Sequence, residues 1–213
     1  MKPQLVVARN IAAAAAERFL QIAPRTVALA GGSTPRRLYQ RLAGCAFPWP
    51  ETEVFFGDER CVPPDHPDSN FRMASEALLA SVSAKVHRMC GESCDAAHYE
   101  AKLRVVFGDR LPAFDLVLLG LGEDGHTASL FPDDAALQER KRWVVRVERP
   151  DYARMTLTLP VLSAAQVAIF LVAGAAKREA LRQLLAGGKN PAARVQAKRV
   201  IIIADEEAAE RTA

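Results

Sequence analysis

A histidine and two acidic residues lie in a glycine-rich segment near the middle of the chain. Residues 120–132 read GLGEDGHTASLFP, which places His126 two positions after Asp124. A mostly apolar run at residues 114–119 precedes the segment, and its length and branched side chains predict a buried strand. Open α/β sheets bind ligands at the ends of their strands, and histidine exchanges protons near neutral pH. We therefore expect His126 to be a general base, with Asp124 orienting the turn; the alternative is a histidine that only caps the turn.

The three glycines of this segment also match the GxGxxG fingerprint of dinucleotide-binding proteins. In that arrangement Glu123 and Asp124 would lie against the pyrophosphate, and the two carboxylates would repel it. Pro132 follows soon after, so no long helix clearly opens here. We therefore predict a catalytic turn rather than a dinucleotide site.

A second glycine-rich segment, AGGSTP at residues 30–35, lies between a predicted strand and a predicted helix. Gly31 and Gly32 allow backbone N–H groups to approach a ligand closely, and Ser33 or Thr34 can cap the helix. The N-terminus of a helix attracts phosphate. The segment lacks the lysine of a nucleotide-binding P-loop, so it favours a simple phosphate ester; an ordinary capped turn is the alternative.

Charged side chains also stand at the ends of other predicted elements. Asp58 and Arg60 come just after a predicted strand at residues 54–57, where they form either part of a site or a surface salt bridge. Arg154 opens a predicted strand, and Lys177 begins a predicted helix. Taken singly, each of these two cations is better explained as a solvated surface residue.

Two histidines and two cysteines fall close together at His87, Cys90, Cys94 and His98. Their spacing is not that of a standard zinc site, so we predict no metal there. The chain has two further cysteines, too few in total to staple a chain of 213 residues. Because the sequence has no export signal, we expect four free thiols in a reducing cytoplasm.

The elements that must position these residues alternate between strand-like and helix-like patterns. This alternation predicts an α/β fold with a mainly parallel sheet and helices on both faces, and a single domain over residues 1–213. The predicted strands are residues 5–8, 26–30, 54–57, 116–119, 143–147, 155–159, 167–173 and 200–204. The predicted helices are residues 11–22, 35–42, 71–80, 98–107, 177–185 and 206–211.

The composition limits the classes of partner. Half of the residues are hydrophobic, enough for a sizeable core. Twenty-eight basic residues against 25 acidic ones give a net charge of +3, which is weak and scattered and does not favour nucleic acid. An anionic small molecule is compatible with this balance. No apolar run approaches the roughly 18 residues of a membrane span, so we expect no membrane partner.

Five segments together resemble the 6-phosphogluconolactonases in order and spacing. They are residues 31–35, 57–63 with 68–70, 120–132, 154–158 and 174–177. The resemblance implies the three-layer, Rossmann-like fold shared with glucosamine-6-phosphate deaminases. It also implies a cytoplasmic enzyme of the oxidative pentose phosphate pathway, which hydrolyses 6-phospho-D-glucono-1,5-lactone to 6-phospho-D-gluconate without a cofactor or metal. We expect a monomer whose partner is its small-molecule substrate.

The resemblance also implies roles for individual residues. His126 corresponds to the general base of the family, and Asp58 and Arg60 correspond to the acid and the arginine beside the lactone. From its position two residues before His126, rather than from the resemblance, we expect Asp124 to orient the turn or to contact a sugar hydroxyl. The positions expected to bind the phosphate are Gly31, Gly32, Ser33, Thr34, Arg154 and Lys177.

Two other functions remain open. A glucosamine-6-phosphate deaminase of the same fold carries a carboxylate five residues after the histidine, whereas this chain has Phe131 there. A non-catalytic sugar-phosphate-binding protein would keep the phosphate site but would not need His126 or Asp58. No DNA-binding module is visible beside these motifs, which disfavours a regulator.

Overall fold

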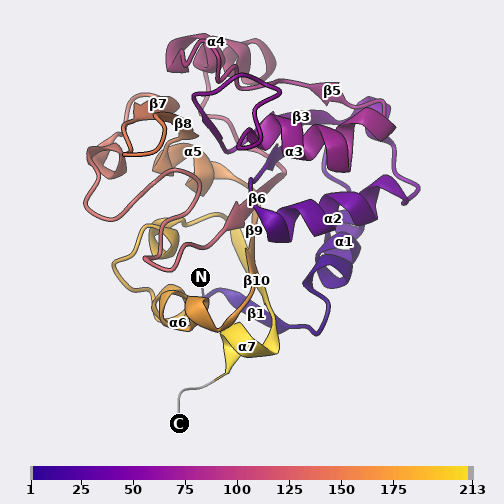
Figure 1. The fold of residues 1–213 in the computed structure, drawn as a ribbon, viewed down its shortest axis with the longest axis vertical. Helices are drawn as coiled ribbons and strands as arrows, with labels where there is room; N and C mark the ends of the chain where they lie inside the picture. Colours follow the sequence, from indigo (N-terminus) through magenta and orange to yellow (C-terminus); the bar gives the residue numbers. More distant parts are fainter. Residues whose placement is uncertain (1, 211–213) are drawn as a thin grey trace.

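The computed structural model describes residues 2–210, in which helices pack around a seven-stranded sheet (Figure 1). All neighbouring strands in this sheet are parallel. In chain order they are β1 (Gln4–Val7), β2 (Thr26–Leu29), β3 (Glu53–Phe56), β5 (Lys85–Val86), β6 (Leu116–Gly120), β9 (Val167–Val172) and β10 (Arg199–Ala204). Across the sheet their order is β1-β10-β9-β6-β2-β3-β5.

The central strands are apolar because both of their faces are covered. All six residues of β9 are buried, as expected for a parallel sheet between two layers of helices. Figure 1 shows α1 (Ile11–Ile22) and α2 (Ser33–Ala43) on one side of these strands, and α5 (Leu159–Ala164) and α6 (Arg178–Leu185) on the other. The predicted fold class is therefore confirmed.

The remaining helices are α3 (Asn70–Ala77), α4 (Ala96–Phe107) and α7 (Glu206–Ala209). Polar side chains fix several helix starts, since a side-chain oxygen satisfies a backbone N–H that has no partner within the helix. Ser69 Oγ accepts from Arg72 N at 3.2 Å at the start of α3. The last predicted helix was extended to residue 211, which lies outside the described residues. No helix in residues 2–210 is long and apolar enough to cross a membrane.

A second, smaller sheet is antiparallel and was not predicted as a separate unit. It contains β4 (Asp58–Arg60), β8 (Arg154–Leu157) and β7 (Val144–Val147), in the order β4-β8-β7. Gly57 connects it to the main sheet: its N–H donates to Leu29 O at 2.8 Å, and its carbonyl accepts from Leu157 N at 2.8 Å. This sheet aligns Arg60 opposite Arg154.

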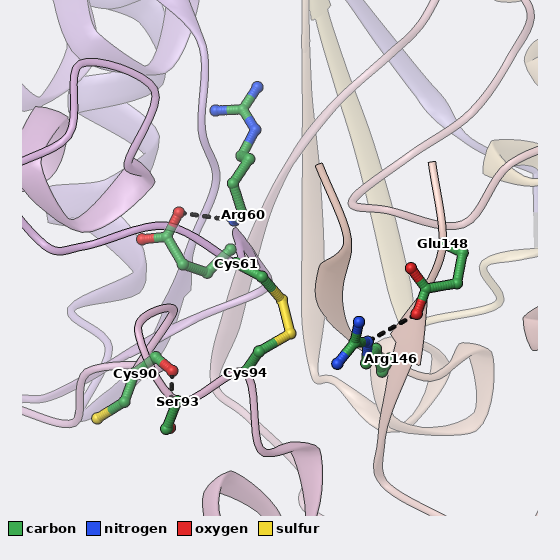
Figure 2. The surroundings of a disulfide bond; sticks show 8 residues. Arg60, Cys61, Cys90, Ser93, Cys94, Arg146 and Glu148 are labelled. Carbon is green, nitrogen blue, oxygen red and sulfur yellow. Dashed lines mark hydrogen bonds and ion pairs between the residues drawn. A yellow bond between two sulfur atoms is a disulfide. The ribbon is translucent and has the colours of Figure 1, made fainter. Parts of the chain in front are cut away.

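The expectation of four free thiols was wrong for one pair. Cys61 and Cys94 form a disulfide, with their Cα atoms 5.1 Å apart (Figure 2). Cys45 and Cys90 are free. The turn before Cys94 packs directly on the end of β4: a Cβ on Gly91 would lie 2.3 Å from the carbonyl oxygen of Arg60. This contact brings together two cysteines that are 33 positions apart.

Candidate active site

A cavity of about 260 Å³ opens at the carboxyl ends of β2, β6 and β9. This edge of a parallel sheet is the usual ligand site of open α/β folds. Nine of the ten residues predicted for the site line the cavity, and Asp124, the tenth, contacts one of them. The nine are Gly31, Gly32, Ser33, Thr34, Asp58, Arg60, His126, Arg154 and Lys177.

The glycine-rich segment at residues 30–35 forms the start of α2. Gly32 is the N-cap, with φ of 106°, a backbone conformation that favours glycine. Ser33 and Thr34 are therefore already inside the helix, and the prediction that one of them caps it was wrong. In the part of the chain that the structure describes, no side chain caps this helix start. Its first N–H groups are left for a ligand at the cavity wall.

His126 is held by the turn that carries it. Asp124 Oδ1 accepts a hydrogen bond from His126 N at 3.0 Å and lies 2.7 Å from His126 Nδ1. Partial burial opposes the ionisation of Asp124, but the backbone and ring hydrogen bonds of His126 outweigh it and hold the pKa of Asp124 below its ordinary value. An ionised carboxylate only accepts, so Nδ1 carries the proton and Nε2 keeps its lone pair. This tautomer suits a base.

Close packing defines the position of the imidazole ring. A Cβ on Gly122 would lie 2.0 Å from His126 Nδ1, so only glycine leaves room for the ring. On another side the ring packs on Phe131, with centroids 4.6 Å apart. Gly125 has φ of 83° and faces Asn190, whose Cβ would be 2.5 Å from an added methyl group. The glycines predicted to allow a tight turn thus also make space for particular side chains.

Asp58 links the histidine turn to β4. Asp58 is 7% exposed, and its Oδ2 accepts from Ser129 Oγ at 2.6 Å. Ser129 N in turn donates to Thr156 Oγ1 on β8 at 3.2 Å. Asp58 therefore stands between the cavity and the segment that follows His126.

Arg60 is fixed by residues outside the predicted set of site residues. Its Nη1 donates to Asn70 Oδ1 at 2.7 Å and to Asp68 O at 2.9 Å. Beneath it, Glu59 is 1% exposed and accepts from the backbone N–H groups of Asn70 and Phe71, both at 2.7 Å. Burial raises the pKa of Glu59, and these hydrogen bonds offset part of that effect. The segment at residues 68–70, which is part of the family resemblance, could have identified Asn70 as a site residue.

The other two cations approach the cavity from separate elements. The Arg154 side chain is 13% exposed, and its Nη2 donates to Asp151 Oδ2 at 2.6 Å. Arg154 also lines the cavity, so its guanidinium lies at the cavity wall. Lys177 Nζ lies 3.7 Å from Glu123 Oε1, an exposed carboxylate. Arg60, Arg154 and Lys177 thus give the cavity a cationic wall.

The His–Cys cluster does not come together as a metal site. Cys94 is in the disulfide, and His87 is bonded to Glu53 and stacked on Phe55 with centroids 4.4 Å apart. No group of three or more His, Cys, Asp or Glu side chains in the described ranges could hold a metal ion.

Comparison with known proteins assigns this arrangement to a family. The model of the glucosamine-6-phosphate isomerases/6-phosphogluconolactonase family matches residues 4–203. The chain belongs to this family. Among curated members, the 6-phosphogluconolactonase of Synechocystis sp. is 46% identical over 176 residues, which is 78% of this chain and 73% of its own length. The human 6-phosphogluconolactonase is 37% identical over 186 residues, covering 79% of this chain and 72% of the human protein.

Solved structures of the family share the whole fold. The 6-phosphogluconolactonase of Leishmania guyanensis superposes with a TM-score of 0.88 at 28% identity, covering 100% of both chains. A monomeric glucosamine-6-phosphate deaminase superposes with a TM-score of 0.82 at 22% identity, covering 98% of this chain and 99% of its own. The family and the shared fold expected from the sequence are confirmed.

Proposed function

We propose that this protein hydrolyses 6-phospho-D-glucono-1,5-lactone to 6-phospho-D-gluconate in the oxidative pentose phosphate pathway. The observation that carries the proposal is the His126–Asp124 pair at a cavity with a cationic wall. The curated relatives named as 6-phosphogluconolactonases support the choice of substrate.

The proposed reaction begins with water. His126 Nε2 removes a proton from a water molecule, which adds to the C1 carbonyl of the lactone, and Asp124 stabilises the imidazolium that forms. Arg60 or backbone N–H groups hold the developing oxyanion, and one good donor contributes roughly 3 kcal/mol. The C1–ring oxygen bond then breaks, and the ring oxygen takes the proton back from His126. A lactone is already an activated ester, so this route needs neither a metal nor a cofactor.

The phosphate anchors the lactone at a distance from the reacting carbon. The free N–H groups at the start of α2, the Arg154 guanidinium and Lys177 Nζ are suitable donors for its oxygens. Binding energy gained there holds the carbonyl in place for attack. In this scheme Asp58 accepts a hydrogen bond from Ser129 and so holds the segment after His126 in place.

Phe131 favours lactone hydrolysis over deamination. It stands where the deaminase motif carries a carboxylate, and its ring packs on His126. The test is a coupled assay of freshly prepared lactone against glucosamine 6-phosphate, corrected for spontaneous lactone hydrolysis. We expect turnover of the lactone alone, and a His126→Ala variant slower by about 10²–10⁴. Deamination of glucosamine 6-phosphate, or binding without turnover of either compound, would reject the proposal.

The remaining features of the assignment are also proposals. Residues 1–213 act as one domain, because β1 near the start of the chain and β10 near its end pair within the same sheet. The protein is a cytoplasmic monomer whose partner is its sugar-phosphate substrate rather than nucleic acid. Light scattering coupled to size-exclusion chromatography tests the monomer, whose chain mass is 23.2 kDa.

A further inference from the structure

We propose that Asn70 is a positioning residue of this active site, which orients Arg60 and Asp58 together and thereby sets the rate of the proposed hydrolysis. The inference rests on the proposed function for its kinetic test but not for its structural one. Asn70 is the first residue of α3, is 2% exposed, and has an edge on the cavity.

Both the oxygen and the nitrogen of the Asn70 side-chain amide form hydrogen bonds with site residues. Oδ1 accepts from Arg60 Nη1 at 2.7 Å, and Nδ2 donates to Asp58 O at 2.9 Å and to Asp58 Oδ1 at 3.3 Å. Arginine can only donate, and a carbonyl or an ionised carboxylate can only accept. The neighbours therefore fix which end of the amide is oxygen and which is nitrogen.

The backbone of Asn70 is equally constrained. Its N–H donates to the buried Glu59 Oε1 at 2.7 Å. On the opposite side the side chain lies against Gly31, where an added Cβ would be 2.0 Å from Asn70 Oδ1. The amide thus touches the phosphate-binding turn, the arginine and the acid at once, and it has no room to rotate.

This arrangement leaves one nitrogen of the Arg60 guanidinium, Nη2, available to bind the substrate. Nη1 is occupied by Asn70 and Asp68, whereas within the described residues Nη2 has no protein partner. Without Asn70 the guanidinium would keep a single hydrogen bond to a backbone carbonyl and could swing out of the cavity. Because a displacement of about 1 Å can cost a hundredfold in rate, the loss should appear in catalysis.

The first experiment is a double-mutant cycle on the lactone with Asn70→Ala, Arg60→Ala and the double variant. We expect Asn70→Ala to lower kcat/KM by about 10–100-fold in the parent protein. When Arg60 is already alanine the loss should be clearly smaller, since coupled residues are non-additive and only the contacts with Asp58 remain to be lost. The same loss in both backgrounds would overturn the proposal.

Ser69→Ala is the matched control. Ser69 is as buried as Asn70 and caps the same helix, but its hydroxyl bonds to Glu59 and Arg72 rather than to Arg60 or Asp58. We expect it to lower Tm while kcat/KM stays within about threefold of the parent. A Ser69→Ala loss of kcat/KM equal to that of Asn70→Ala would reduce Asn70 to a helix-stabilising residue.

Asn70→Asp supplies a pH readout in a variant of nearly unchanged size. It keeps an acceptor for Arg60 but places two carboxyls within about 3.3 Å, and only a proton shared between them restores the donor. Its activity relative to the parent should rise as the pH falls, and a ratio that does not change with pH would contradict the mechanism.

A crystal structure of Asn70→Ala separates this inference from the proposed function. If the parent protein fails to hydrolyse the lactone, the function is wrong, but Arg60 should still be displaced in the variant. An Arg60 guanidinium in its original place would refute the positioning role whatever the substrate.

Discussion

Replacing Gly122 by alanine should inactivate the enzyme without unfolding it. The added Cβ would lie 2.0 Å from His126 Nδ1 and 2.6 Å from Asp124 Oδ1. Ordinary contact begins near 3.4 Å, so the ring must move by about 1.4 Å or the turn must open. A misplacement of about 1 Å can cost a hundredfold in rate, and loss of a general base costs about 10²–10⁴. We therefore expect kcat to fall by about 10²–10³.

The assay is steady-state lactone hydrolysis, with Tm measured on the same samples. Gly44→Ala is the control, because its Cβ would meet only Arg41 O at an ordinary 3.7 Å and its φ is −92°. The double variant Gly122→Ala/His126→Ala should be no slower than His126→Ala alone, since both changes remove the same base. A Gly122→Ala enzyme with near-parental kcat, or a double variant slower by the product of both effects, would refute the argument.

Three further predictions concern the phosphate, metals and the disulfide. Lys177→Ala should raise KM for the phosphorylated lactone by about 10–100-fold, since one charge-assisted hydrogen bond contributes about 1.5–3 kcal/mol. The same change should barely affect the hydrolysis of unphosphorylated gluconolactone. Equal losses on both lactones would place the phosphate site elsewhere. Extensive EDTA treatment should leave activity and Tm unchanged, and stoichiometric zinc lost together with activity would contradict this. Cys61→Ser should lower the free energy of unfolding under oxidising conditions by about 3–4 kcal/mol, the chain-entropy expectation for a 33-residue separation. Cys45→Ser, which removes a free thiol, should leave that free energy unchanged. Equal urea midpoints for both variants would show that the bond adds no stability.

Six of the seven strands of the main sheet could be predicted, because each is a short apolar run. The edge strand β5 was missed, since it has only two residues and both are exposed. A run such as VAIFLV at β9 is too short for a helix and is buried along its length. β4 could not be found in this way: its three residues are Asp, Glu and Arg, and they form a strand only by pairing with β8 almost a hundred positions later. α5 was also missed, although Pro160 near its start was a usable signal.

In the candidate site, too, features set by neighbouring residues could be predicted, whereas contacts between residues farther apart in the sequence could not. Strand ends and glycine turns pointed to His126, Asp58 and the phosphate turn, and these residues do line one cavity. The capping role of Ser33 or Thr34 was wrong because Gly32, with its positive φ, is the N-cap, so the helix begins at Ser33, two residues before the predicted start. The role of Asn70 and the disulfide depend on side-chain contacts 10, 12 and 33 positions apart, which residue type and hydrophobic periodicity do not specify.

The contact between Gly31 and Asn70 has a consequence for how the sequence can change over time. An alanine at position 31 would collide with the Asn70 amide, so this glycine is constrained by a side chain 39 positions away rather than by its own backbone. The two positions should therefore vary together among relatives: where position 70 carries a smaller residue, position 31 should tolerate alanine or serine. Substitution at either position alone should be rare. The double change Gly31→Ala/Asn70→Ser should lower the stability of the fold less than Gly31→Ala alone, because the smaller side chain removes the collision.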